Sequence, residues 1–112
     1  MLPAHELFLL LSDETRLRCL TLLSVEEELC VCELSHTLES IQPKISRHLS
    51  LLRRSKLVLH ERRGKWVYYR LNTNLTAKNV SILSGILDEL KDTEPFRSDH
   101  KKLIHFRKSC SC

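Results

Sequence analysis

Two cysteines separated by one residue, Cys30 and Cys32, form the motif with the clearest chemistry in this sequence. Thiolates bind soft ions, and the N-terminus of a helix lowers the pKa of a thiol there. Residues i and i+2 lie about 200° apart on a regular α-helix. Two such thiolates meet one ion only if the start of the helix is frayed or unwound, so we expect ion binding to distort the helix that carries the pair.

The other three cysteines have different surroundings. Cys19 lies in the leucine-rich stretch 17–23, which indicates a packing role. Cys110 and Cys112 end the sequence as Cys-Ser-Cys. They could supply a further thiolate, pair on oxidation with each other or with another chain, or take no part.

The sequence favours a reducing compartment. Its longest apolar run has five residues, too short to cross a membrane, and its N-terminus lacks the cationic segment of a secretory signal. We therefore expect a cytoplasmic protein with no membrane partner. In that compartment cysteines are more often ligands or core residues than disulfides.

A block of positive charge lies between residues 44 and 70. It holds nine basic residues and one acidic residue, net +8, whereas residues 1–43 are net −6. Such a block is the footprint expected of a phosphate-binding surface, and a solvated basic face is the alternative. Two glycines leave no room for a phosphate-binding loop, and the HExxH and GxSxG signatures are absent, so we expect no enzyme.

Most of the elements that must position the cysteines and the basic block are predicted to be helices. Apolar spacing and capping residues predict helices near 3–11, 13–25, 31–38, 42–54 and 76–91. Alternation then predicts strands at 57–62 and 65–71 around a turn at Arg63-Gly64.

This order is that of a winged helix-turn-helix: mainly α with a β-hairpin wing, about five helices and two antiparallel strands. We expect residues 1–94 to form the DNA-binding and dimerisation domain. Residues 95–112 are expected to form a C-terminal tail or a short extra helix.

The basic block falls on the second helix of the turn motif and on the hairpin, the elements that contact DNA in such folds. The candidate DNA-contacting residues are Gln42, Lys44, Ser46, Arg47, His48, Ser50, Arg62, Arg63 and Lys65. Gln42, Ser46 and Arg47 are expected to read bases, since Gln pairs with adenine, Arg with guanine and Ser with either. For His48 a packed, hydrogen-bonded position is an equal alternative, and Trp66 is expected to pack against the hairpin.

Four segments resemble the arsenical-resistance operon repressors, the ArsR family: LSDETRLR (11–18), ELCVCEL (28–34), QPKISRHL (42–49) and GKWVYYRL (64–71). The resemblance implies a homodimeric winged-helix repressor whose first and last helices form the dimer interface. It implies binding to operator DNA, expected to be an imperfect inverted repeat, without any required cofactor. It also implies release of the DNA when As(III) or Sb(III) binds as inducer. The family's metalloid-binding role carries over to Cys30 and Cys32.

Two positions depart from the family pattern. Enterobacterial members carry a third cysteine one turn after the pair, where this chain has Ser35. Cys110 or Cys112, from the same or the partner chain, is the candidate replacement, and a small thiol such as glutathione is another. Ile41 stands where the family often has a helix-capping serine, so Ser40 is expected to cap one residue earlier.

Three alternatives remain open at this stage. The same repressor could respond to cadmium or lead through four thiolates. It could respond to thiol oxidation, or the chain could be a metal chaperone or metal-transfer enzyme, which the basic block disfavours. The zinc site found on the last helix of some family members is not expected, because Asp88, Asp92, His100 and His105 lack its spacing.

Overall fold

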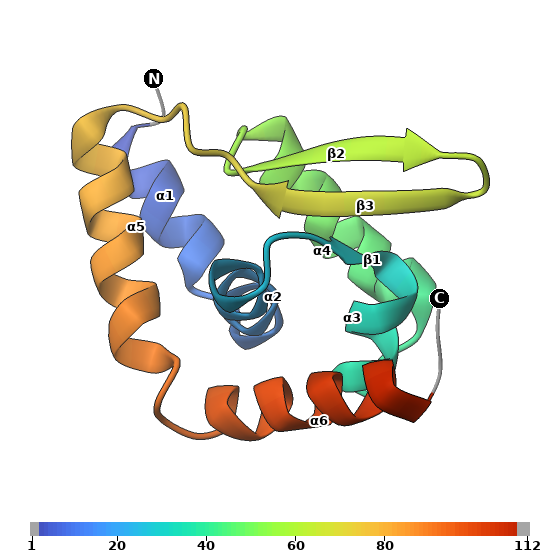
Figure 1. Cartoon of the computed structure of the whole chain (residues 1–112). Coiled ribbons are helices and arrows are strands. Elements are labelled where there is room, and N and C mark those ends of the chain that lie inside the picture. The colour runs from blue at the N-terminus through green and yellow to red at the C-terminus, as the bar shows by residue number, and fades with distance from the viewer. Residues whose placement is uncertain (1–2, 110–112) are drawn as a thin grey trace.

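The computed structural model describes residues 3–109 and is mainly helical (Figure 1). Within this range the helices are α1 (Ala4–Leu11), α2 (Glu14–Val25), α3 (Val31–Thr37), α4 (Gln42–Arg54), α5 (Ala77–Leu90) and α6 (Phe96–Ser109). The strands are β1 (Leu29–Cys30), β2 (Val58–Arg63) and β3 (Trp66–Leu71), in the antiparallel order β1-β3-β2. The expected winged helix-turn-helix is confirmed, with one helix and one short strand more than predicted.

The turn between α3 and α4 is held by a side chain that sequence reasoning did not use. The hydroxyl of Ser35 donates a hydrogen bond to the backbone carbonyl of Ser40. The residue that caps α4 is Ile41, and its side chain makes no capping hydrogen bond. The expectation that Ser40 caps α4 is therefore wrong, because Ser40 belongs to the turn that Ser35 closes.

The wing is a two-stranded hairpin extended by β1. Arg63 pairs with Trp66, so Gly64 and Lys65 form its two-residue loop, one position later than the predicted Arg63-Gly64 turn. Gly64 has a φ of +64°, in the left-handed region that favours glycine. On the other edge of β3, Cys30 of β1 pairs with Tyr68, which ties the cysteine segment to the wing.

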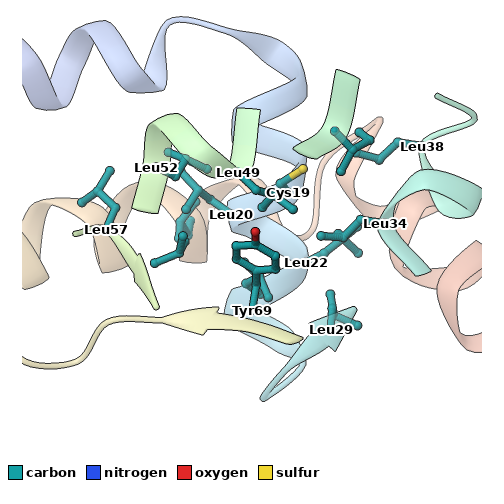
Figure 2. Packing of buried hydrophobic residues seen from close by; sticks show 14 of the residues in the cluster. Cys19, Leu20, Leu22, Leu29, Leu34, Leu38, Leu49, Leu52, Leu57 and Tyr69 are labelled. Atoms are coloured by element: carbon teal, nitrogen blue, oxygen red, sulfur yellow. The ribbon is translucent and has the colours of Figure 1, made fainter. Parts of the chain in front are cut away.

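The core lies where α2, α3, α4 and the sheet meet (Figure 2). Leucines from every one of these elements fill it, and Cys19 of α2 is fully buried among them, as the sequence predicts. Burial raises the pKa of the Cys19 thiol to about 12. This cysteine is therefore a packing residue that stays protonated.

The C-terminal segment takes the second of its two predicted forms, an extra helix. Residues 96–109 form α6, which packs along α2 and ends beside α3 (Figure 1). Leu103 is fully buried, and Asp99 is 2% exposed. Arg18 of α2 donates two hydrogen bonds to Asp99, at 2.8 and 2.7 Å. A charged residue inside the buried stripe interrupts the apolar period, which is why the sequence pattern predicts only a weak element here. No helix within residues 3–109 has the length and apolar character needed to span a membrane.

Candidate thiol site and nucleic-acid interface

The sulfur atoms of Cys30 and Cys32 lie 2.6 Å apart. Cys30 is the last residue of β1 and the N-cap of α3, with an extended backbone (φ −88°, ψ 163°), whereas Cys32 lies in the first turn of the helix. The predicted condition, that the pair converges only where the start of the helix is frayed or unwound, is met because Cys30 stands outside the helical repeat. The junction of β1 and α3 brings the two thiols together without any distortion of α3.

A capping box holds Cys30 in place. Its backbone N–H donates to Oε1 of Glu33 at 3.0 Å, and the backbone N–H of Glu33 donates to the Cys30 sulfur. Burial raises the pKa of the Cys30 thiol, while the hydrogen bond from the Glu33 backbone acts in the opposite direction. The expectation of a lowered pKa at a helix start is therefore wrong for Cys30, which is 1% exposed, because desolvation outweighs the helix terminus.

A cavity of about 240 Å³ adjoins the two cysteines. Its wall comes from α3, the start of α4 and the wing: Cys30, Cys32, Gln42, Ser46, Lys65 and Trp66, with Val31 and Val67. Gln42 and Ser46 are two of the three residues predicted to read bases. The thiol pair and part of the predicted DNA-reading surface therefore line the same cavity.

Helix α4 presents most of its candidate residues to solvent. Gln42, Lys44, Ser46 and Arg47 are exposed and Ser50 is half-buried, while Ile45, Leu49 and Leu52 face the core. At the wing, Arg62 and Lys65 are exposed. Arg62 donates to the carbonyl of Gly64 at 3.1 Å, and the Lys65 ammonium lies 5.3 Å from the centre of the Trp66 ring.

His48 takes the packed position. Its Nδ1 lies 3.3 Å from Nη1 of Arg16 and 3.8 Å from Oδ2 of Asp13, both near the start of α2. Its side chain is 16% exposed, and burial lowers its pKa. His48 therefore links α4 to α2, and burial favours the neutral form of its ring.

Arg63 is already engaged in ion pairs. Its guanidinium donates to both carboxylate oxygens of Glu28 and to Glu61, and it lies 4.6 Å from the centre of the Tyr68 ring. A contact from Arg63 to DNA would have to exchange these partners for a phosphate. Of the three wing residues predicted to contact DNA, Arg62 and Lys65 make no ion pair within residues 3–109 that the structure shows.

Helix α6 contacts the thiol segment directly. The guanidinium of Arg107 donates to Oε2 of Glu33 at 2.5 Å, to the carbonyl of Glu28 at 3.1 Å, and to Glu26. Phe106 stacks on His36 of α3, with ring centres 4.0 Å apart. Sequence reasoning missed Glu33 and Arg107, although the three-residue step from Cys30 to Glu33 is the spacing of a capping box.

Cys110 and Cys112, the candidates for a third thiolate, lie outside the described residues. Among residues 3–109, no group of three or more His, Cys, Asp or Glu side chains is arranged to hold a metal ion. The part of the thiol site that the structure shows is thus the Cys30–Cys32 pair.

Comparison with known proteins identifies the helix-turn-helix region. Residues 13–59 match the family model described as "Bacterial regulatory protein, arsR family". The chain is 48% identical over 81 residues to the arsenic resistance transcriptional regulator ArsR1 of Pseudomonas putida, covering 72% of this chain and 63% of that one. It is 53% identical over 78 residues to the arsenical resistance operon repressor of Escherichia coli K12, covering 70% and 67%. A cadmium resistance regulatory protein CadC homologue of Staphylococcus aureus is 40% identical over 67 residues, covering 60% and 55%.

Solved structures share the fold of this chain. HlyU from Vibrio cholerae N16961 superposes with a TM-score of 0.65 at 32% identity, over 79% of this chain and 87% of that one. These relatives are named as regulators of transcription, the class that the sequence favours over an enzyme. On its motif, its fold and its sequence identity to these proteins, the chain belongs to the arsR family of bacterial regulatory proteins.

Proposed function

We propose that this chain is a homodimeric transcriptional repressor that releases operator DNA when arsenite or antimonite binds Cys30 and Cys32. The observation that carries the proposal is the convergence of the two thiols on a cavity that Gln42 and Ser46 also line. The donor set suits the inducer, because thiolates are the ligands that soft ions prefer. Cys110 and Cys112 are the candidates for a further thiolate.

The DNA-binding role follows from α4 and the wing. A recognition helix places its N-terminal residues against base edges in the major groove. The exposed Gln42, Ser46 and Arg47 are at that end of α4, while Lys44 beside them and Arg62 on the wing would contact phosphates. No cofactor is needed for these contacts. A repressor of this kind would act in the cytoplasm, on an imperfect inverted repeat.

The dimer is supported by exposed apolar side chains on α1 and α5. Phe8 and Leu9 of α1 are 55% and 66% exposed, and Val80 and Ile82 of α5 are 36% and 38% exposed. Figure 1 shows α1 and α5 on the same side of the molecule, away from the wing. We propose that a second copy covers this face, which would place the two recognition helices on successive turns of DNA.

Coupling between inducer and DNA follows from what holds Cys30. Its backbone is paired to Tyr68 of the wing on one side and capped by Glu33 of α3 on the other. A displacement of Cys30 therefore acts at once on β3 and on the first helix of the DNA-binding pair. Allosteric couplings of about 1–3 kcal/mol are typical, which is about 5- to 150-fold in DNA affinity.

The test is a fluorescence-anisotropy titration on DNA selected in vitro for binding to this protein. Arsenite is expected to release the wild type. Cys30→Ser and Cys32→Ser should bind the DNA but remain bound at the same arsenite concentration. Cys19→Ala is the matched control, since Cys19 is buried in the core, and it should be released like the wild type. Retention of the wild type on DNA at saturating arsenite would overturn the proposal, as would normal release of Cys30→Ser.

Cadmium or lead is the second candidate inducer, favoured by the similarity to the Staphylococcus aureus cadmium resistance protein. Thiol oxidation is the third. Arsenite, antimonite, cadmium and peroxide should be titrated side by side on the same complex. Release by cadmium alone would support the divalent-metal alternative, and release by peroxide without metal would support the redox alternative.

A further inference from the structure

Helix α6 carries a concentration of positive charge that the proposed function does not use. Its 14 residues include five basic side chains and one acidic side chain, net +4 with the histidines neutral. The acidic residue, Asp99, is buried and paired with Arg18 of α2, and Arg107 is paired with Glu26 and Glu33. The exposed surface of α6 therefore holds basic residues and no acidic residue of the helix itself.

Part of this basic surface lines a cavity of about 630 Å³. Lys101, Lys102 and His105 of α6 are exposed and form one wall of it. The end of α3 and the turn before α4, residues 35, 36 and 39–41, form the other wall. Lys101 and His105 are four residues apart and so share a face of the helix. Two ammonium groups and an imidazole are thus gathered beside the turn of the helix-turn-helix.

The cavity adjoins the end of α4 that is expected to read DNA. Ile41 is exposed and lines it, while Gln42, the next residue, lines the cavity beside the thiols. A helix with its side chains is about 10–12 Å across and the major groove is about 12 Å wide, so a helix in the groove has a phosphate strand close on each side. Side chains that flank the start of α4 are therefore placed near phosphates.

We propose that Lys101, Lys102 and His105 bind phosphates of the DNA backbone, which makes α6 a third DNA-contacting element beside α4 and the wing. The proposal rests on the DNA-binding role proposed above and is independent of the inducer. Ammonium and imidazole N–H groups donate to phosphate oxygens. Such contacts strengthen binding and fix orientation, but they carry no sequence information.

An ion pair at this cavity makes the proposal testable in both directions. Nζ of Lys102 lies 3.1 Å from Oε1 of Glu39, and both side chains are exposed. An exposed pair contributes little to stability, so exchanging Glu39 for a phosphate costs little. Glu39 therefore competes with DNA for Lys102 and repels the phosphate. Lys101 makes no ion pair in the part of the chain that the structure describes.

The test is the salt dependence of binding, in anisotropy titrations of the full chain on DNA selected in vitro for binding to it. Each phosphate contact contributes about 0.9 to the slope of log affinity against log salt concentration. Lys101→Ala combined with Lys102→Ala should therefore reduce that slope by about 2 for each subunit on the DNA. The loss of affinity should be the same factor on selected and on random DNA, because phosphate contacts do not read sequence.

The matched control is Lys91→Ala combined with Arg97→Ala. It removes the same charge from two exposed ion pairs at the end of α5 and the start of α6, outside the residues that line the cavity (Figure 1). Glu39→Gln should act in the opposite direction and tighten binding, a gain that damaged folding cannot produce. A slope in the lysine variant reduced no more than in the control would overturn the proposal. Glu39→Gln binding no more tightly than the wild type would overturn it as well.

Neutral methylphosphonate linkages, each replacing one phosphate of the selected DNA, locate the contact. At the phosphates that α6 contacts, the wild type should lose affinity and the lysine variant should lose none. If the two proteins lose affinity equally at every position, the lysines act only through net charge and the proposal is wrong.

This inference and the proposed function can fail separately. If the wild type stays on DNA at saturating arsenite but the slope falls as expected in the lysine variant, the inducer role is wrong and the α6 contact stands. If arsenite releases the wild type but the lysine variant keeps the wild-type slope, the α6 contact is wrong and the inducer role stands. A wild type that binds no DNA at low salt would overturn both.

Discussion

The buried ion pair between Arg18 and Asp99 offers the sharpest test of how α6 is held. The Asp99 side chain is 3% exposed and accepts two hydrogen bonds from one guanidinium, at 2.8 and 2.7 Å. In Arg18→Met the chain keeps apolar bulk of similar length but leaves a buried carboxylate without a partner. Breaking a buried pair in this way costs about 3–5 kcal/mol of unfolding free energy.

The assay is urea unfolding followed by circular dichroism, at one fixed protein concentration because the proposed dimer would contribute to stability. Arg97→Met is the matched control: it is the same substitution at an arginine of α6 whose ion pair is exposed. Its partner Glu94 is exposed, so we expect a loss of about 0–1 kcal/mol. Arg18→Met combined with Asp99→Asn should recover part of the loss, since the buried charge is gone. A loss in Arg18→Met no larger than that in Arg97→Met would refute the reasoning.

Three further predictions follow from the surface and the core. Arg47→Ala should lower DNA affinity by about 1–3 kcal/mol and relax sequence preference. Lys44→Ala should weaken binding to all sequences and reduce the slope of log affinity against log salt concentration by about 1. If Arg47→Ala weakens binding to selected and random DNA equally in anisotropy titrations, Arg47 does not read bases. Leu9→Asp should shift the protein from dimer to monomer in sedimentation, because it puts a charge on the exposed apolar face of α1, and a dimer as tight as the wild type would place the interface elsewhere. Cys19 should resist iodoacetamide at pH 8 in the folded protein and react in urea, since its pKa is raised to about 12 by burial; mass spectrometry that finds Cys19 alkylated in the native state would contradict its packing role.

Elements with strong local signals were predictable from the sequence. Helix α4 has the predicted bounds, Gln42–Arg54, because Pro43 fixes its first turn and Ile45, Leu49 and Leu52 repeat at helical spacing. The wing was predictable to within one residue, since alternation and Gly64 both mark it. Local sequence signals are sufficient to predict an element that packs a single apolar stripe against the core.

Features that depend on distant partners were not predictable. Strand β1 has two residues, and it exists because β3, nearly forty positions later, pairs with it. A prediction that lacks this pairing counts Cys30 as part of the helix, and it then places the two thiols on opposite sides of that helix. Helix α6 was predictable only as one of two alternatives, because Asp99 is an unfavourable core residue until Arg18 is seen to face it.

The thiol site was therefore only partly predictable. The motif names Cys30 and Cys32, but their approach depends on a strand end, a capping box with Glu33 and the contact from Arg107. Ser35 is an example of a departure whose meaning needs the structure. The sequence marks it as a lost ligand, and the structure shows that its hydroxyl closes the turn before α4.

Trp66 reports on the cavity where the thiols and the DNA-reading helix meet, and it is the sole tryptophan of the chain. Arsenite should be titrated into the complex with labelled DNA while Trp66 fluorescence and DNA anisotropy are recorded on the same sample. We expect both signals to change together and to be complete at one arsenite per subunit, with neither changing in Cys32→Ser. Release of DNA without any change at Trp66, or a complete change at Trp66 with the DNA still bound, would contradict an inducer site that shares its cavity with the recognition helix.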